Sequence, residues 1–123
     1  MSEQRYRTVA YVRVSTTDQT TSLDSQIRHF NEVMDTTPHL VNCGIYVDNG
    51  ISGRFLNRRE GFLQMLTDCE LGRVDRILCK SIKRFGRNTL DIVRAIARLT
   101  ELNISVYFEQ ENIDTIKDRN NII

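Results

Sequence analysis

Apolar residues gather in four short runs along the chain. The runs are rich in Val, Ile and Tyr and do not alternate cleanly with polar residues. They cover 8–14 (TVAYVRV), 40–47 (LVNCGIYV), 74–80 (VDRILCK) and 104–108 (ISVYF). Strands that are buried on both faces have this pattern, because neither face needs polar side chains. The sequence therefore predicts four strands of a largely buried sheet.

Between these runs, apolar residues recur at helical spacing over 23–34, 62–69 and 92–99. Such spacing predicts an amphipathic helix in each gap. Side chains that can cap a helix precede the first and third patterns. The candidates are Thr21 or Ser22 for the first helix and Asn88 or Thr89 for the third.

Strands that alternate with helices predict a three-layer α/β fold, with a mostly parallel sheet of four or five strands and helices on both faces. In such a sheet, functional sites form beyond the carboxyl ends of the strands. Functional residues are therefore expected in the segments that follow the strands, namely 15–21, 48–59, 81–88 and 109 onward.

Length and composition indicate one ordinary globular domain. The chain has 123 residues, of which 40% are hydrophobic and 27% charged. Its apolar runs are too short to cross a bilayer, so no membrane partner is expected. The first residues, MSEQRYRTVAYV, lack the apolar stretch and cleavage site of a secretory signal. We therefore expect the chain in the cytoplasm.

Neither cysteine nor histidine spacing indicates a metal site. Cys43, Cys69 and Cys79 are widely spaced and fit neither a disulfide framework nor a zinc site, so reduced core thiols are expected. His29 and His39 have no partner at ligand spacing, so a structural or surface role is expected for both.

Positive charge is concentrated in one part of the chain. The net charge is only +1, yet residues 73–98 contain eight Lys or Arg and only two Asp. The rest of the chain is therefore net acidic. Charge of one sign in one segment indicates an anionic partner at one edge of the molecule.

A serine and several arginines follow the predicted strands. Arg13 and Ser15 are two residues apart, so both point to the same side of the end of the first strand. A serine hydroxyl is a weak nucleophile, and nearby cations can activate its attack on phosphorus. Arg84 and Arg87 follow the third strand, which in a parallel sheet can neighbour the first. Together these side chains could surround one phosphate.

Each of these signals also has an ordinary structural explanation. A Ser-Thr-Thr after a strand is commonly turn and cap chemistry, and basic loops are usually only solvated. Phe85 could simply plug the core below its loop. The chain contains no GxSxG elbow, no P-loop and no GxGxxG motif.

The order of the motifs along the chain is more specific. YVRVSTTDQTTSLDSQ, YVDNGISGR, NRREGFLQML, VDRILCKSIKRFGRNTLD and YFEQENIDT follow one another from about Arg7 to Thr115. In this order and spacing they resemble the catalytic domain of serine recombinases, the resolvase and invertase family. GISG and SIKRFGRN are most similar to the large integrase and transposase members.

The resemblance implies that Ser15 attacks a DNA phosphodiester, which forms a 5′-phosphoseryl link and frees a 3′-hydroxyl. After an exchange of subunits, the reverse attack reseals the strands without a metal or nucleotide cofactor. The implied partners are double-stranded DNA at recombination sites and further copies of the chain, as a homodimer or tetramer of the full-length protein.

The resemblance also assigns site residues. Arg13, Arg84 and Arg87 match the family's phosphate-binding and transition-state arginines. Gly86 is expected to permit a tight turn between the last two. Further positions match a second group of active-site residues, namely Gln26, Arg59, Ser52, Asp48, Asp75 and Tyr11. For Tyr11 a core role, and for Asp75 a structural role at a strand start, stay open.

Two departures from the family pattern affect this interpretation. Many small resolvases carry an Asp where this chain has Lys83, so the general acid and base stay unassigned. The family also continues into a long dimerisation helix and a DNA-binding domain, so residues 1–123 are expected to be a catalytic domain truncated before both.

Two other classes of function share the alternation of strands and helices. A receiver-like or nucleotide-binding module would need clustered acidic residues or a Gly-rich phosphate loop, and the strand ends contain neither. A catalytically silent, DNA-associated assembly or regulatory domain of the same fold stays open as the alternative.

Overall fold

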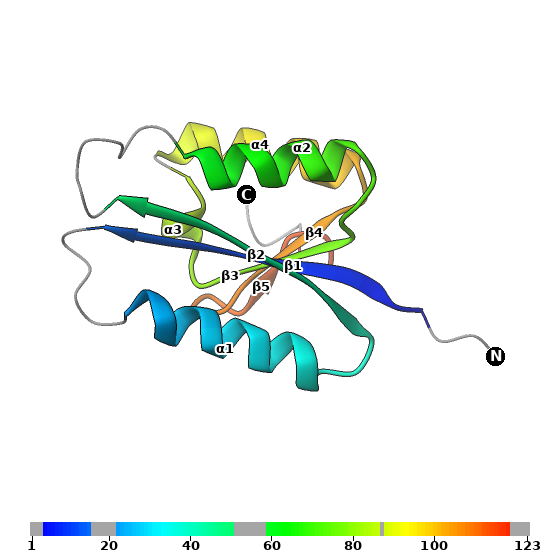
Figure 1. The fold of residues 1–123 in the computed structure, drawn as a ribbon. Helices are drawn as coiled ribbons and strands as arrows, with labels where there is room; N and C mark the ends of the chain where they lie inside the picture. The colour runs from blue at the N-terminus through cyan, green and yellow to red at the C-terminus, as the bar shows by residue number, and fades with distance from the viewer. Residues whose placement is uncertain (1–3, 16–21, 51–58, 87, 119–123) are drawn as a thin grey trace.

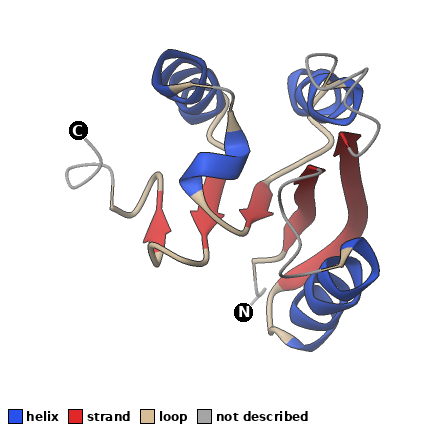
Figure 2. Ribbon diagram, turned by 90° about the vertical axis from the view of Figure 1, so that its left-hand side faces the viewer, coloured by secondary structure: helices blue, strands red, loops and turns tan. Residues whose placement is uncertain are grey.

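The structure is a computed structural model that describes residues 4–15, 22–50, 59–86 and 88–118. Within these ranges, five strands form one sheet in the order β2-β1-β3-β4-β5 (Figures 1 and 2). The first four strands pair in parallel, and β5 is antiparallel to β4. The strands are β1 (Tyr6–Ser15), β2 (Leu40–Gly50), β3 (Arg76–Cys79), β4 (Ser105–Phe108) and β5 (Ile113–Asp114).

Helices cover both faces of this sheet, which confirms the predicted three-layer α/β fold. Figure 1 shows α1 on one side and α2 and α4 on the other. Ser22 caps α1 and Asn88 caps α4, because each side chain accepts a hydrogen bond from a main-chain N–H three residues later. The helices are α1 (Leu23–Thr36), α2 (Glu60–Glu70), α3 (Ile82–Phe85) and α4 (Thr89–Glu101).

Two short elements were not predicted. The segment expected as a loop at 81–88 contains α3, which is a single helical turn. The polar stretch after Glu109 contains β5, which is two residues long and pairs with β4 through Phe108 and Ile113. Both elements are too short to show a hydrophobic period, so they depend on tertiary contacts.

The cysteine prediction is right for two residues and wrong for the third. Cys69 and Cys79 are buried, and burial raises the pKa of each thiol to about 12. Cys43 is exposed. It lies on β2, an edge strand whose register shifts against β1 beside Gly44, a residue with φ of +115°. At this irregular edge the strand is not covered on both faces.

Phe85 joins α3 to the core. Its side chain is fully buried, in agreement with the prediction that Phe85 fills the core below this segment. Its ring lies edge-on to the rings of Phe62 and Phe108, with centroids 5.0 and 5.5 Å away. Tyr11 lies 6.4 Å away in the same manner. These contacts bury a large aromatic side chain and fix the position of α3 beside the carboxyl ends of β1 and β3.

The start of α2 lies unusually close to the end of β2. A β-carbon on Gly61 would lie 2.6 Å from the carbonyl oxygen of Val47 and 3.0 Å from Oδ1 of Asp48. The nearer contact is with main chain, which a side-chain movement cannot relieve. Only glycine therefore fits this approach without a shift of the strand or helix.

We predict that Gly61→Ala destabilises the fold by about 1–3 kcal/mol because the added methyl overpacks the β2–α2 contact. The sign of the stability change separates this steric effect from helix propensity, since Ala in an unconstrained helix is more favourable than Gly by roughly 1 kcal/mol. Urea unfolding measures the difference. Gln64→Ala, an exposed position on the same helix, is the control and should stay within about 0.5 kcal/mol of wild type. A stabilised Gly61→Ala protein would contradict the close approach.

Candidate active site

The site lies at the point where the connections of the sheet change direction. β1 and β3 are neighbours, but the chain leaves β1 toward β2 on one side and leaves β3 toward β4 on the other. The two connections separate at the carboxyl ends of β1 and β3, which is where open α/β sheets place their sites. Figure 2 looks onto this edge, with the short α3 near the middle of the view.

Arg84 and Arg13 meet at this edge. Arg84 belongs to α3, directly after β3, and Arg13 lies on β1. The Nη1 group of Arg84 donates a hydrogen bond of 2.7 Å to the carbonyl oxygen of Arg13, in a partly buried position. The guanidinium of Arg84 therefore lies beside the last residues of β1, two positions before Ser15. This is the neighbourhood that the sequence predicted for these two arginines.

Arg59 joins the same group from α2. It precedes the first residue of that helix, with a left-handed backbone (φ 31°). Its guanidinium carbon lies 3.7 Å from the ring centroid of Phe62, and its Nη2 donates to the carbonyl of Phe85. A cation held over an aromatic face in a partly buried place is attracted by the ring. Arg59 is thereby fixed next to α3.

Asp48 organises the surroundings of Arg59. Its carboxylate accepts hydrogen bonds from the Tyr11 hydroxyl at 2.6 Å and from the main-chain N–H groups of Gly61 and Phe62 at 2.7 and 3.0 Å. The last two are among the N–H groups at the start of α2 that have no partner within the helix. Asp48 therefore caps α2 and sets its start relative to β2.

Tyr11 lies in the core with only 1% of its surface exposed. Burial and the hydrogen bond to Asp48 raise the pKa of its phenol. It is thus a neutral donor that is already engaged by Asp48. The structural interpretation of Tyr11 is the one that this geometry supports.

Gln26 lies near the start of α1 and is buried, with 3% of its surface exposed. Because α1 follows β1 and runs back along the sheet, its first residues lie at the same carboxyl edge. However, α1 covers the opposite face of the sheet from α2 and α4 (Figure 1). Gln26 is therefore at the predicted edge but across the sheet from Arg59 and Arg84.

Asp75 lies at the other end of the molecule, so its assignment to the site is corrected. It precedes β3, and its carboxylate accepts hydrogen bonds from Nε and Nη2 of Arg7, both at 2.9 Å. Arg7 is eight residues before Ser15, which at strand spacing is roughly 26 Å. The parallel direction of β1 and β3 fixes this result, because a residue before a strand lies at its amino end.

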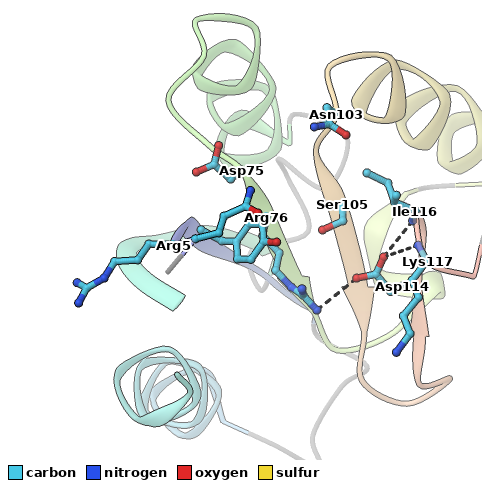
Figure 3. Close-up of a pocket in the computed structure, with 10 residues that line it drawn as sticks. Arg5, Asp75, Arg76, Asn103, Ser105, Asp114, Ile116 and Lys117 are labelled. Atoms are coloured by element: carbon cyan, nitrogen blue, oxygen red, sulfur yellow. Dashed lines mark hydrogen bonds and ion pairs between the residues drawn. The ribbon is translucent and has the colours of Figure 1, made fainter. Parts of the chain in front are cut away.

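A pocket of about 380 Å³ opens at this amino edge (Figure 3). In it, Arg76 pairs with Asp114 at 3.3 Å. Apart from Asp75, none of the predicted site residues that the structure describes lines it. The lining residues are Gln4, Arg5, Tyr6, Asp75, Arg76, Asn103, Ser105, Asp114, Ile116 and Lys117.

Three predicted site positions fall outside the part of the chain that the structure describes. These are the side chain of Ser15, the whole of Ser52 and the whole of Arg87. The backbone of Ser15 is described, as the last residue of β1, where it pairs with Gly50. Lys83 is exposed on α3.

Within the described ranges, no three side chains of His, Cys, Asp or Glu gather closely enough to hold a metal ion. No helix within those ranges has the length and apolar character needed to span a membrane.

Sequence reasoning missed the acidic residues that follow β4. Glu111 accepts a hydrogen bond of 3.1 Å from the N–H of Ile82, the first residue of α3. Glu109 lies 2.7 Å from Nε2 of His29 on α1. The segment after 109 was among the predicted functional segments, but nothing in the sequence indicated which helix each carboxylate would reach.

The fold and the site define a three-layer α/β domain whose arginines meet at the switch point of its sheet. The family model described as "Resolvase, N terminal domain" matches residues 8–123. A Pseudomonas putida protein named resolvase/recombinase is 31% identical over 109 residues, which is 89% of this chain and 54% of that protein. Serine recombinase PinR of Escherichia coli (strain K12) is 30% identical over 102 residues, 82% of this chain and 48% of PinR.

A solved structure agrees with these relatives. The N-terminal catalytic domain of TP901-1 integrase superposes with a TM-score of 0.74 at 26% identity, over 92% of this chain and 85% of that one. The chain therefore belongs to the resolvase N-terminal domain family, among the serine recombinases, as the motifs had indicated. It spans about half the length of the curated relatives that it matches.

We predict that Asp75→Asn lowers the free energy of unfolding at pH 7, because it removes the ion pair with Arg7. The loss should be small, since that pair is largely exposed. Hydrogen bonds from Arg7 hold the pKa of Asp75 below its usual value. The pair therefore stabilises the fold above the unfolded-state pKa of about 3.9, and this contribution is lost as pH falls through the lower pKa of the folded state.

Urea unfolding of wild type and Asp75→Asn across this pH range tests the account. The two proteins should differ at neutral pH and converge in acid. Arg7→Gln removes the other partner and should give the same convergence. A difference that stays constant with pH would contradict the ion-pair role of Asp75.

Proposed function

We propose that this chain is the catalytic part of a site-specific DNA recombinase, with Ser15 as the nucleophile. One observation carries the proposal: Arg84 donates a hydrogen bond to the carbonyl of Arg13, two residues before Ser15. An arginine of α3 and an arginine of β1 thus meet near the end of β1. Membership of the resolvase family supports DNA as the substrate.

The proposed reaction is a phosphoryl transfer. The Oγ of Ser15 loses its proton and attacks phosphorus, and the bond between phosphorus and the 3′-oxygen breaks. The products are a 5′-phosphoseryl link and a 3′-hydroxyl that has gained a proton. One phosphate ester replaces another, so the step needs no external energy source and the reverse attack can reseal the strand.

In this scheme Arg13, Arg84 and Arg87 stabilise the negative charge on the transferring phosphoryl group. A guanidinium suits this role because it stays charged and donates hydrogen bonds to two phosphate oxygens at once. Arg59 borders the group through its contact with Phe85. Tyr11 is not assigned the role of acid or base, because its hydroxyl is committed to Asp48 and its pKa is raised.

The chain length supports a further part of the proposal. Since relatives are about twice as long, we propose that residues 1–123 form the catalytic domain of a longer recombinase with a dimerisation helix and a DNA-binding domain. The complete protein would act in the cytoplasm as a dimer or tetramer on double-stranded DNA. The catalytic domain alone would bind DNA weakly and without sequence preference, since it contacts only a phosphate or two.

The test is formation of a covalent adduct by the complete recombinase on DNA that contains its recombination site, with EDTA present. We expect a protein–DNA adduct that Ser15→Ala reduces by at least about 1,000-fold, as loss of a nucleophile does. Ser22→Ala is the matched control. It removes the hydroxyl that caps α1 and should leave the adduct in place.

The remaining outcomes count against the proposal. An adduct that persists in Ser15→Ala would remove the nucleophile assignment, and an adduct that needs added metal would remove the mechanism. If wild type forms no adduct but still assembles on DNA, the chain is instead the catalytically silent assembly domain.

A further inference from the structure

We propose that Glu111 is a positioning residue for Arg84. It lies in the turn between β4 and β5 and holds the first turn of α3, the helix that carries Arg84. The role in catalysis rests on the function proposed above, whereas the contact itself does not.

The helix α3 needs an external acceptor at its start. It has only four residues, and a single helical turn is unfavourable on its own because ordering the first turn gains few hydrogen bonds. Its N-cap residue, Ser81, makes no capping hydrogen bond with its side chain. The first N–H groups of a helix lack partners within the helix. For Ile82, Oε1 of Glu111 supplies the partner at 3.1 Å.

The turn that carries Glu111 is itself well anchored. The N–H groups of Glu109 and Gln110 donate to the carbonyls of Cys79 and Lys80, at 3.0 and 2.9 Å. These carbonyls belong to the last residue of β3 and to the residue after it, shortly before α3 begins. On the other side of the turn, the Tyr107 hydroxyl donates to Oδ1 of Asn112 at 2.7 Å. Glu111 is thus presented from a turn that is bonded to the same strand that leads into α3.

The contact bears on Arg84 because α3 is short. Arg84 is the third residue of the helix, and its own N–H donates to the carbonyl of Ser81 at 3.2 Å. Phe85 fixes the end of α3 in the core, and Glu111 fixes its start. Without Glu111, the first turn can open while Phe85 stays buried, and the main chain of Arg84 shifts. A displacement of about 1 Å in a catalytic group can lower a rate on the order of 100-fold.

The first experiment measures single-turnover DNA cleavage and DNA affinity in the complete recombinase. We expect Glu111→Ala to slow cleavage by about 10- to 100-fold while DNA affinity stays within about 2-fold, because geometry rather than binding is lost. Glu111→Gln keeps a side-chain carbonyl at the same position, so it should restore the rate to within about 3-fold of wild type.

Glu109→Ala is the matched control. It removes one negative charge from the same turn, but Glu109 contacts the half-exposed His29 on α1 and its main-chain bond to β3 is kept. The control should cleave at close to the wild-type rate. An equal loss in Glu109→Ala and Glu111→Ala would overturn the proposal, since charge alone would then explain both.

The second experiment tests the hydrogen bond between Glu111 and Ile82 without depending on DNA cleavage. Amide hydrogen exchange at Ile82 should accelerate by at least about 10-fold in Glu111→Ala and stay near wild type in Glu111→Gln. Exchange at Leu78, in the buried β3, should be unchanged in both variants. Unchanged exchange at Ile82 in Glu111→Ala would overturn the proposal, as would unchanged cleavage. If wild type does not cleave DNA at all, the proposed function fails and the Ile82 signal alone decides whether Glu111 holds α3.

Discussion

The parallel pairing of β1 with β3 is the constraint on which the site depends. Their pairing begins with Thr8 opposite Arg76 and ends with Tyr11 opposite Cys79, so both strands run toward the same edge of the sheet. β1 continues as far as Ser15, whereas β3 ends at Cys79 and turns into α3. The helix α3, which follows β3, therefore lies against the final residues of β1. An antiparallel pairing would have placed these segments at opposite ends of the sheet.

Side chains that bond to main-chain groups stabilise this edge. Two carboxylates accept hydrogen bonds at helix starts, and two arginines donate hydrogen bonds to carbonyls. Asp48 caps the start of α2, and Glu111 bonds the start of α3. Arg59, directly before α2, donates to the carbonyl of Phe85. Arg84, within α3, donates to the carbonyl of Arg13. A partly buried cation is costly unless it has hydrogen-bond acceptors. Main-chain carbonyls, which carry no net charge, supply one such acceptor to each of these two guanidinium groups.

Sequence alone predicted the long elements, since each carries a hydrophobic period or a buried apolar run. It predicted the meeting of Arg13 and Arg84 from the parallel sheet. It missed α3 and β5, whose stability comes from contacts with residues distant in sequence, such as Glu111 with Ile82. Asp75 was assigned to the site by motif matching, although its place before a strand already indicated the amino edge.

The tight turn predicted at Gly86 is wrong, although the structure requires glycine there for another reason. A tight turn was expected, yet its backbone is extended, with φ of −150° and ψ of 167°. What requires glycine is space: a β-carbon would lie 2.5 Å from Cγ1 of Ile92 and 3.2 Å from the main-chain nitrogen of the same residue, on α4. Packing between elements of this kind leaves no local signature in the sequence.

The most direct test of the account asks whether the arginines act on phosphate charge. Cleavage by wild type and Arg84→Ala would be compared on DNA whose scissile phosphate is either native or replaced by an uncharged methylphosphonate. On native DNA, loss of Arg84 should slow cleavage on the order of 100- to 1,000-fold, the usual cost of losing one such donor. On the methylphosphonate the loss should shrink to within about 10-fold, because much less charge needs stabilising. An equal loss on both substrates would contradict the account and leave Arg84 with a purely structural role.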